Sequence, residues 1–379
     1  MKHALVLYGA TDLGASEFSA DILWATKFKV PDPVLFIQIE QKKVLLVSAL
    51  EVERAHKEAR VDEVILLTAY RGENHESPLI SFLKNEGVTH VTTPESMRWS
   101  IAQHLHKHFE VSAVRNPFGK ERSIKREDEL SEIEAAQRAV ERAVEKGRQF
   151  LKEAEVRGAE IFHPTLPDPV TSHDVRKVID HDLYDQGYLG IDSIVACGAS
   201  AADPHCRGEG LLRPHQPIVL DIFPRSLESL YFADQTRTVF KGEPDMMFQK
   251  MYAAVLDAQE QSLSLIVPGA KSDTVMQRAQ EVLKKHGFPT SVTERPVYGF
   301  IHGLGHGVGI EIHELPSIGR SGDILEEGMV VTVEPGLYYS KERSGIPVGG
   351  IRIEDMVVVT HTGHRNLTRF AKQLSDMIV

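Results

Sequence analysis

The chain has little of what marks secreted, membrane-spanning or nucleic-acid-binding proteins. It has two cysteines, Cys197 and Cys206, among 379 residues, which is too few for a disulfide framework and favours a reducing, cytoplasmic compartment. No apolar run approaches the roughly 18–20 residues that a membrane-spanning helix needs. The formal net charge of −11 repels phosphates, so we expect neither nucleic acid nor a membrane surface as a partner.

Common nucleotide and zinc motifs are also absent from the sequence, although glycine occupies every second position from 303 to 309. This stretch has neither the G-x-G-x-x-G spacing of a dinucleotide site nor the Gly-Lys-Ser/Thr of a P-loop. His302 and His306 are four residues apart, but the alternating glycines argue against the helix that an H-E-x-x-H zinc motif requires.

The length of the chain and its secondary-structure patterns indicate two domains. Residues 1–120 alternate β-rich runs with helical patterns, which predicts a small α/β domain. We expect strands over residues 4–8, 34–39, 44–47 and 64–67, and helices over residues 51–60, 78–86 and 97–108.

Residues 121–379 are predicted to form a second domain of the α+β class. A long helix, expected over residues 125–157, has one apolar face, which is typical of a linker helix docked on its domain; a coiled-coil partner helix is the alternative. Helices and hairpins then segregate instead of repeating as βαβ units. We expect helices over residues 172–186, 245–266 and 272–286, and strands over residues 218–223, 330–339 and 351–360.

Four carboxylates lie in or beside the predicted strands of the second domain. Asp221 and Asp234 each follow an apolar run, with a turn-prone stretch between them, so neighbouring strands of a hairpin would bring both together. Glu334 and Glu354 lie within β-branched runs, where a free carboxylate is poorly accommodated. Each alone is more often a cap or a surface charge, but four carboxylates with an imidazole balance two divalent cations and predict metal-assisted hydrolysis.

Three histidines cluster beside the glycines: His302, His306 and His313. A single histidine is more often a structural group, whereas three together indicate a site. His306 and His313 are seven residues apart, on opposite faces of a regular strand, so both can serve one site only if the chain bends at the glycines.

With these motifs the chain resembles, over nearly its whole length, the metal-dependent peptidases of the pita-bread fold, and among them the Xaa-Pro aminopeptidases and prolidases. The resemblance implies two divalent metal ions, with Asp234 and Glu354 as bridging carboxylates. Manganese or cobalt is expected, with zinc or iron as alternatives. The implied metal ligands are Asp221, Asp234, His306, Glu334 and Glu354.

The resemblance also implies roles beyond metal binding. His313 and His205 are the implied catalytic hydrogen-bond donors to the developing oxyanion, and Glu334 is the implied proton shuttle. His302 and Arg352 are the implied substrate-side residues, with Arg352 also organising the metal site. These roles are carried over by analogy.

Two departures from the family pattern bear on the substrate. Asp221 and Asp234 are thirteen residues apart, more than is common in the family, so the loop between them is expected to reshape the rim of the pocket. Ser317 stands where dipeptide-specific prolidases often place an arginine for the substrate carboxylate, although Arg320 lies close by. We therefore expect an Xaa-Pro aminopeptidase, with an Xaa-Pro dipeptidase as the alternative.

Two further interpretations compete with this expectation. A creatinase-like hydrolase would work without metal, but such relatives lack the five ligands that this chain keeps. A catalytically inactive binding module of the same fold is the non-enzymatic alternative. The resemblance also implies Xaa-Pro peptides as substrates and a homodimer as the assembly.

Overall fold

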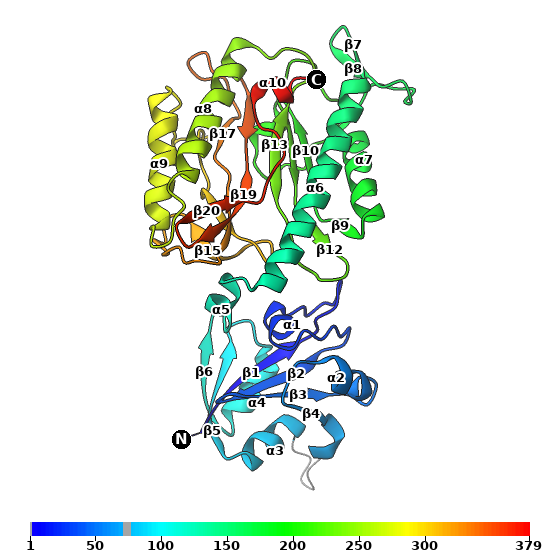
Figure 1. The fold of residues 1–379 in the computed structure, drawn as a ribbon, viewed down its shortest axis with the longest axis vertical. Helices are drawn as coiled ribbons and strands as arrows, with labels where there is room; N and C mark the ends of the chain where they lie inside the picture. The colour runs from blue at the N-terminus through cyan, green and yellow to red at the C-terminus, as the bar shows by residue number, and fades with distance from the viewer. Residues whose placement is uncertain (1, 71–76) are drawn as a thin grey trace. The chain divides into compact units, whose positions relative to one another are not determined.

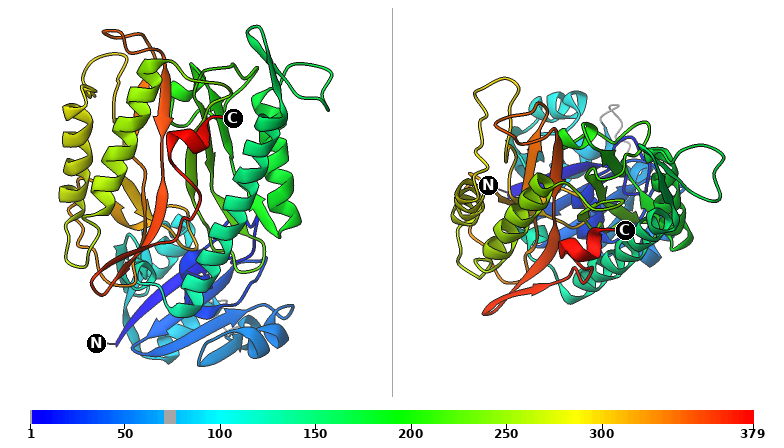
Figure 2. Two further views of the ribbon diagram at one scale, coloured as in Figure 1. Left: turned by 45° about the horizontal axis from the view of Figure 1, so that its top comes forward. Right: turned by 90° about the horizontal axis from the view of Figure 1, so that it is seen from above.

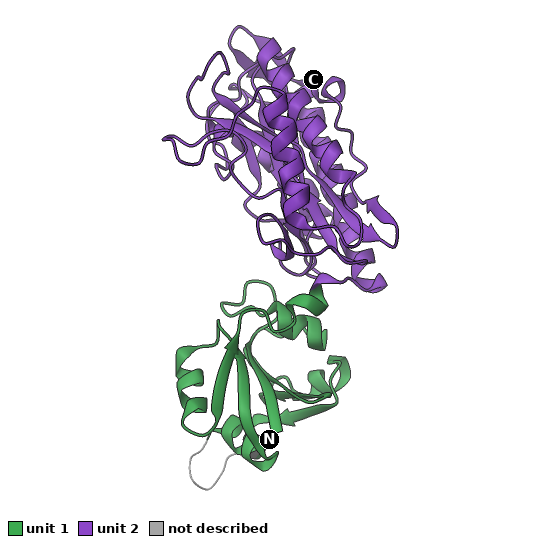
Figure 3. Ribbon diagram, turned by 90° about the vertical axis from the view of Figure 1, so that its left-hand side faces the viewer, with its two compact units in different colours: residues 1–122 green, residues 123–379 purple. Residues whose placement is uncertain are grey.

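The computed structural model describes residues 2–70 and 77–379. Residues 1–122 and 123–379 form two compact units (Figure 3). No helix within the described ranges is both long enough and apolar enough to cross a bilayer.

The first unit is built on a mixed sheet with the strand order β4-β3-β2-β1-β5-β6. Strand β2 pairs antiparallel with both β1 and β3. Strand β4 pairs parallel with β3, β5 with β1, and β6 with β5. The strands are β1 (Lys2–Gly9), β2 (Val34–Ile39), β3 (Lys42–Val47), β4 (Glu63–Leu66), β5 (Val88–Pro94) and β6 (Glu110–Val114).

Helices cover both faces of this sheet. Phe36 and Ile37 are neighbours on β2 and point to opposite faces, as alternation along a strand requires. Phe36 packs in one apolar cluster with residues of α1 and α2, and Ile37 in another with residues of α3 and α4. The helices are α1 (Ala20–Thr26), α2 (Val52–Glu58), η1 (Leu67–Tyr70), α3 (Pro78–Asn85), α4 (Trp99–His106) and α5 (Gly119–Ser123). This is the α/β arrangement expected for the first part of the chain.

In the second unit, long helices flank the strands (Figures 1 and 2). Helix α6 packs against α7, and α8 packs against α9. Val140 and Val144, which belong to the apolar stripe expected from the sequence, are fully buried on α6, and so is Ile133. Ala135, which was also expected on this face, is exposed. The helices are α6 (Glu127–Glu153), α7 (Ser172–Asp185), η2 (Ser200–Ala202), α8 (Met246–Leu263), α9 (Ser272–Lys285) and α10 (Leu374–Met377).

The strands of the second unit form a sheet of order β10-β11-β13, a sheet of order β15-β14-β16-β19-β20, and the pairs β17-β18, β12-β9 and β7-β8. Most pair antiparallel, as expected for an α+β unit. The strands are β7 (Glu155–Arg157), β8 (Glu160–Phe162), β9 (Tyr188–Gly190), β10 (Ile194–Cys197), β11 (Ile218–Ile222), β12 (Pro224–Ser226), β13 (Gln235–Val239), β14 (Gly305–Gly307), β15 (Glu314–Ile318), β16 (Val330–Val333), β17 (Gly336–Tyr339), β18 (Gly349–Arg352), β19 (Asp355–Thr360) and β20 (Gly363–Asn366).

Two expected strands are each interrupted. The run 330–339 divides into β16 and β17 at Glu334 and Pro335, and the run 351–360 divides into β18 and β19 at Ile353 and Glu354. Pro335 has no backbone N–H to give to a ladder, which accounts for the first break. Each break carries a carboxylate that the sequence assigned to the site.

Candidate metal centre

The two aspartates come from neighbouring antiparallel strands. Asp221 lies in β11, and Asp234 immediately precedes β13. The register places Asp221 opposite Thr236, two residues after Asp234. The hairpin expected from the sequence therefore brings both aspartates to one end of the sheet.

His306 lies in the middle of β14, between β15 and β16. A Cβ atom on Gly305 would lie 2.0 Å from the carbonyl oxygen of Thr332, and one on Gly307 would lie 2.2 Å from that of Leu315. The alternating glycines thus allow the close approach of both neighbouring strands. The backbone N–H of His306 donates to Thr332 Oγ1 at 3.1 Å.

The expected bend between His306 and His313 is a tight reversal of the chain. Strand β14 pairs antiparallel with β15, and Gly307 lies opposite Glu314. His313, immediately before β15, consequently lies beside His306, with 4.3 Å between ring centroids and an interplanar angle of 89°.

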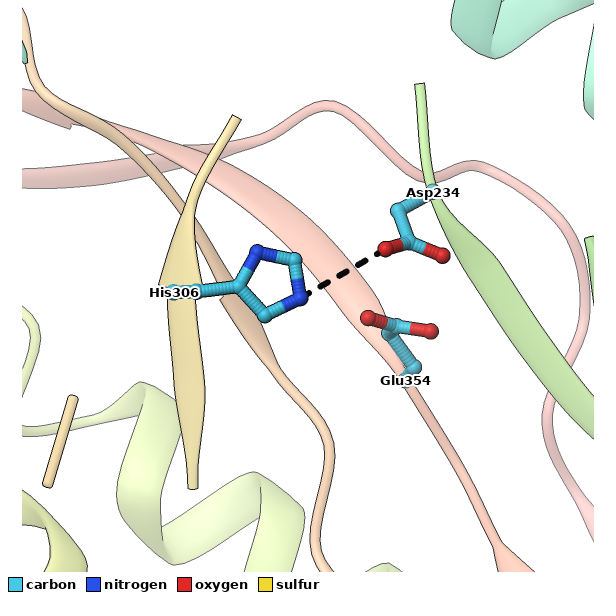
Figure 4. Close-up of side chains that lie close together, drawn as sticks. All are labelled: Asp234, His306 and Glu354. Carbon is cyan, nitrogen blue, oxygen red and sulfur yellow. Dashed lines mark ion pairs between the residues drawn. The ribbon is translucent and has the colours of Figure 1, made fainter. Parts of the chain in front are cut away.

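Asp234, His306 and Glu354 converge from three separate segments (Figure 4). Each offers a donor atom within 4.8 Å of those of the other two. His306 Nε2 lies 3.6 Å from Asp234 Oδ2 and 3.4 Å from Glu334 Oε1. Among the described residues, the buried atoms Asp234 Oδ1 and Glu354 Oε1 have no hydrogen-bond partner. Buried carboxylate oxygens without a donor are costly, and this donor set suits divalent cations.

The pKa shifts of these carboxylates reflect burial and the electrostatic repulsion between them. Burial, followed by the charge of Glu354, raises the pKa of Asp234. Burial and then Glu334 raise the pKa of Glu354 to about 8. For Glu334 burial acts in the same direction, but the hydrogen bond with His306 and nearby positive charges outweigh it and lower the pKa to about 2. Cations between the carboxylates would remove this repulsion.

Asp221 lies outside the group of three. Its Oδ2 accepts a hydrogen bond from Arg352 Nη2 at 2.5 Å, and its Oδ1 lies 3.0 Å from Thr236 Oγ1. The same Thr236 hydroxyl lies 2.8 Å from Glu354 Oε2. Thr236 therefore connects Asp221 to the group formed by Asp234, His306 and Glu354.

A chain of hydrogen bonds runs from Arg352 to His302. Arg352 Nη1 donates to the Tyr338 hydroxyl at 2.8 Å, and that hydroxyl lies 2.9 Å from His302 Nε2. His302 Nδ1 lies 2.6 Å from the carbonyl oxygen of Gly303, so it must be the ring donor, and Nε2 accepts from Tyr338. Burial lowers the pKa of His302, which agrees with this neutral tautomer.

A second buried network fixes the backbone of Glu354. The guanidinium of Arg237 is fully buried and lies 2.8 Å from Asp355 Oδ1. It also donates to the backbone carbonyl of Glu354. The backbone N–H of Glu354 donates to the carbonyl oxygen of Thr236 at 3.1 Å. The strand break at Glu354 is therefore a fixed conformation that aims its side chain at the site.

The second unit contains a pocket of about 790 Å³ at this site. His205 and Phe223 also line the pocket, and Phe223 comes from the long loop between the two aspartates. Ser317 and Arg320 are not among its described lining residues, whereas Arg207 is. The predicted site residues that line it are His205, Asp221, Asp234, His302, His306, His313, Glu334, Arg352 and Glu354.

Sequence reasoning assigned no role to Thr236 or Tyr338. Thr236 lies inside the Asp234-Gln235-Thr236 motif, and its place opposite Asp221 in a hairpin was the one available signal. Tyr338 reaches His302 across 36 positions, and nothing in the sequence marks that contact.

Residues 131–361 match metallopeptidase family M24. The chain belongs to this family. Across 185 residues it is 36% identical to an Xaa-Pro dipeptidase of Pyrococcus furiosus, covering 48% of this chain and 49% of that protein. Across 256 residues it is 31% identical to an uncharacterized peptidase of Staphylococcus aureus, covering 66% and 64%. The matched stretches thus span about half to two-thirds of the length of these curated relatives.

Solved structures of M24-like peptidases share the fold of nearly the whole chain. An Xaa-Pro dipeptidase from Bacillus anthracis superposes with a TM-score of 0.81 at 23% identity, covering 100% of this chain and 95% of that one. A prolidase from Pyrococcus horikoshii superposes with a TM-score of 0.79 at 23% identity, covering 98% of this chain and 95% of that one. An X-Pro aminopeptidase from Thermotoga maritima superposes with a TM-score of 0.77 at 23% identity, covering 97% of this chain and 96% of that one. The predicted family and the predicted α+β pita-bread fold are confirmed.

Proposed function

We propose that this M24 protein is a metal-dependent exopeptidase that hydrolyses the Xaa-Pro bond at the N-terminus of peptides. One observation carries the proposal: Asp234 Oδ1 and Glu354 Oε1 are buried without a donor beside His306, inside a pocket large enough for a short peptide. The names of the similar proteins, Xaa-Pro dipeptidase and prolidase, supply the substrate class.

Asp221, Asp234, His306, Glu334 and Glu354 would hold two divalent ions. When bound, such ions supply charge neutralisation and Lewis-acid polarisation of the scissile carbonyl. Manganese or cobalt fits a donor set of carboxylates with one imidazole. Asp221 supports this assignment least directly, because Arg352 and Thr236 already engage its oxygens.

The remaining groups act on the substrate and on protons. His313 and His205 line the pocket and donate hydrogen bonds to the developing oxyanion or to the next carbonyl. Glu334 is held by His306 and carries a proton from the attacking water to the proline nitrogen. Arg352 holds Asp221 and Tyr338, and through Tyr338 it orients His302 at the pocket wall.

Apolar side chains of the pocket suit a proline ring. Proline has no backbone N–H, so its recognition depends on the shape of an apolar surface more than on strand-like hydrogen bonds. The apolar lining residues are Ile194, Pro204, Phe223, Ile301 and Ile312.

The length of the peptide separates two forms of the proposal. Ser317 and the absence of Arg320 from the described lining favour an aminopeptidase acting on longer peptides. The dipeptidase names of the relatives favour Xaa-Pro dipeptides. A cytoplasmic location agrees with the two free cysteines, and a homodimer rests on the family resemblance alone.

The deciding experiment compares three substrates under defined metal. Metal-free protein is assayed with an Xaa-Pro dipeptide, an Xaa-Pro-Yaa tripeptide and a matched Xaa-Ala-Yaa tripeptide, before and after addition of Mn²⁺. We expect release of the first residue from the proline substrates only, and only with metal. Preference for the tripeptide would establish the aminopeptidase. Metal uptake without turnover on any substrate would instead support the inactive binding module, and turnover in chelator would support a creatinase-like enzyme.

A further inference from the structure

His313 is held in the pocket by its backbone. In the part of the chain that the structure describes, its ring contacts the ring of His306 but makes no recorded hydrogen bond or ion pair. The orientation of the imidazole therefore depends on how firmly the chain on either side is fixed. The next residue, Glu314, begins β15 and supplies that fixation.

The side chain of Glu314, the residue after His313, is largely buried. Its carboxylate lies against Gly309, where an added Cβ atom would come within 2.3 Å of Oε1. The side chain is 6% exposed. Gly309 is itself held by the bond from the Phe232 N–H to its carbonyl oxygen, at 2.8 Å. The turn that carries His313 is thus folded around this carboxylate.

Lys125 neutralises this carboxylate from a distant part of the chain. Its Nζ lies 2.7 Å from Glu314 Oε1, and its side chain is 1% exposed. The backbone of Lys125 is fixed as well, because its N–H donates to the carbonyl oxygen of Gly328 at 2.9 Å. Gly328 and Met329 lead into β16, which ends at Val333, immediately before Glu334. The ion pair therefore ties the His313 turn to the strand that leads to Glu334.

We propose that Lys125 is a positioning residue that, through its buried ion pair with Glu314, holds His313 in register with His306 for the reaction. This inference rests on the proposed function. A buried ion pair has little value as a net source of stability, but it fixes geometry because each partner has one favourable place. Lys125 is not among the described residues that line the pocket, so its proposed effect on the reaction passes through His313.

The test is a double-mutant cycle between Lys125→Met and His313→Ala, assayed on the best Xaa-Pro substrate with saturating Mn²⁺. We expect Lys125→Met to lower kcat about tenfold or more, since misplacement of a catalytic group by about 1 Å costs up to about 100-fold. KM and the amount of Mn²⁺ bound per chain should change little. In the His313→Ala background the same substitution should cause no further loss of kcat. If the fold-loss of kcat in the double variant equals the product of the losses in the two single variants, the proposal is overturned, because Lys125 then acts independently of His313.

A second measurement does not depend on turnover. Amide hydrogen exchange over residues 307–318 should accelerate in Lys125→Met, and unchanged exchange there would overturn the proposal. This readout separates the inference from the proposed function, which fails if wild-type protein with metal cleaves no Xaa-Pro substrate.

Two further variants control for stability. Lys125→Met/Glu314→Gln removes both buried charges and should regain the melting temperature lost by the single variant without regaining kcat; recovery of kcat would overturn the proposal. Arg122→Met breaks another buried ion pair, with Asp21 in the first unit at 2.9 Å, and should leave kcat unchanged. A loss of kcat in Arg122→Met equal to that in Lys125→Met would assign the effect to general destabilisation.

Discussion

Glu354 and Asp355 are neighbours in the sequence, and each is 1% exposed, yet their surroundings are opposite. Asp355 lies 2.8 Å from Arg237 and 2.7 Å from Lys372, and it also accepts a hydrogen bond from Asn366. Glu354 lies close to Asp234, and its Oε1 has no hydrogen-bond partner among the described residues. The protein neutralises Asp355 with two of its own cations, whereas no described residue donates a hydrogen bond to Glu354 Oε1.

The pKa shifts of the two neighbours have opposite signs for this reason. Burial alone would raise the pKa of both carboxyl groups. At Asp355 the positive charges of Arg237 and Lys372 outweigh burial and lower the pKa. At Glu354, burial and the charge of Glu334 act together and raise the pKa to about 8. A buried charge paired within the fold indicates a structural role, whereas a buried charge crowded by like charges indicates a binding site.

The largest expected effect comes from Glu354→Gln, which keeps the size of the side chain and removes its charge. We expect turnover of Xaa-Pro substrates to fall on the order of 10³-fold, because several kcal/mol of transition-state stabilisation depend on bound metal. The metal content per chain should fall as well. The melting temperature of the metal-free protein should not fall, because the substitution removes a like charge from the cluster. Full metal content and activity in this variant would place Glu354 outside the metal centre.

Asp355→Asn is the matched substitution at the neighbouring carboxylate, which is paired within the fold. Arg237 and Lys372 would lose their buried counter-charge, so we expect the free energy of unfolding to fall by about 3–5 kcal/mol. Urea denaturation of the metal-free protein measures this change. Asp257→Asn is the control, because its ion pair with His286 is exposed and should be worth about 1 kcal/mol or less. Equal losses at Asp257 and Asp355 would contradict the structural role of Asp355.

Helices were easier to predict from the sequence than the points where strands are interrupted. The long helices are found within a few residues of their predicted ends, because an apolar stripe at helical spacing survives in the fold: residues 125–157 were expected and α6 spans Glu127–Glu153. Strand runs were also found, but the breaks at Glu334 and Glu354 were not. A β-branched run predicts an extended chain and says nothing of where that chain must turn a carboxylate into a pocket.

Contacts between distant segments were the other limit. The sequence supplied the candidate ligands as residue types, and the structure brings Asp234, His306 and Glu354 together. It could not show that Arg352 and Thr236 would take both oxygens of Asp221. Arg352 comes from a segment more than a hundred residues away, and a single sequence carries no signal for that contact. Thr236 lies on the neighbouring strand of the hairpin, where its place opposite Asp221 was the one available signal.

The smallest expected effect concerns Thr236, the hydroxyl between Asp221 and Glu354. Thr236→Val keeps the shape of a fully buried side chain but removes the group that lies 2.8 Å from Glu354 Oε2 and accepts from Arg352 Nε at 3.1 Å. Loss of a hydrogen bond that orients a metal ligand commonly costs about 10–100-fold in metal affinity, and we expect that range for Mn²⁺ binding measured by calorimetry. Thr236→Ser keeps the hydroxyl and should lose little. Equal losses in Thr236→Val and Thr236→Ser would assign the effect to packing of the methyl group, and unchanged affinity in Thr236→Val would show that Glu354 is oriented by its backbone alone.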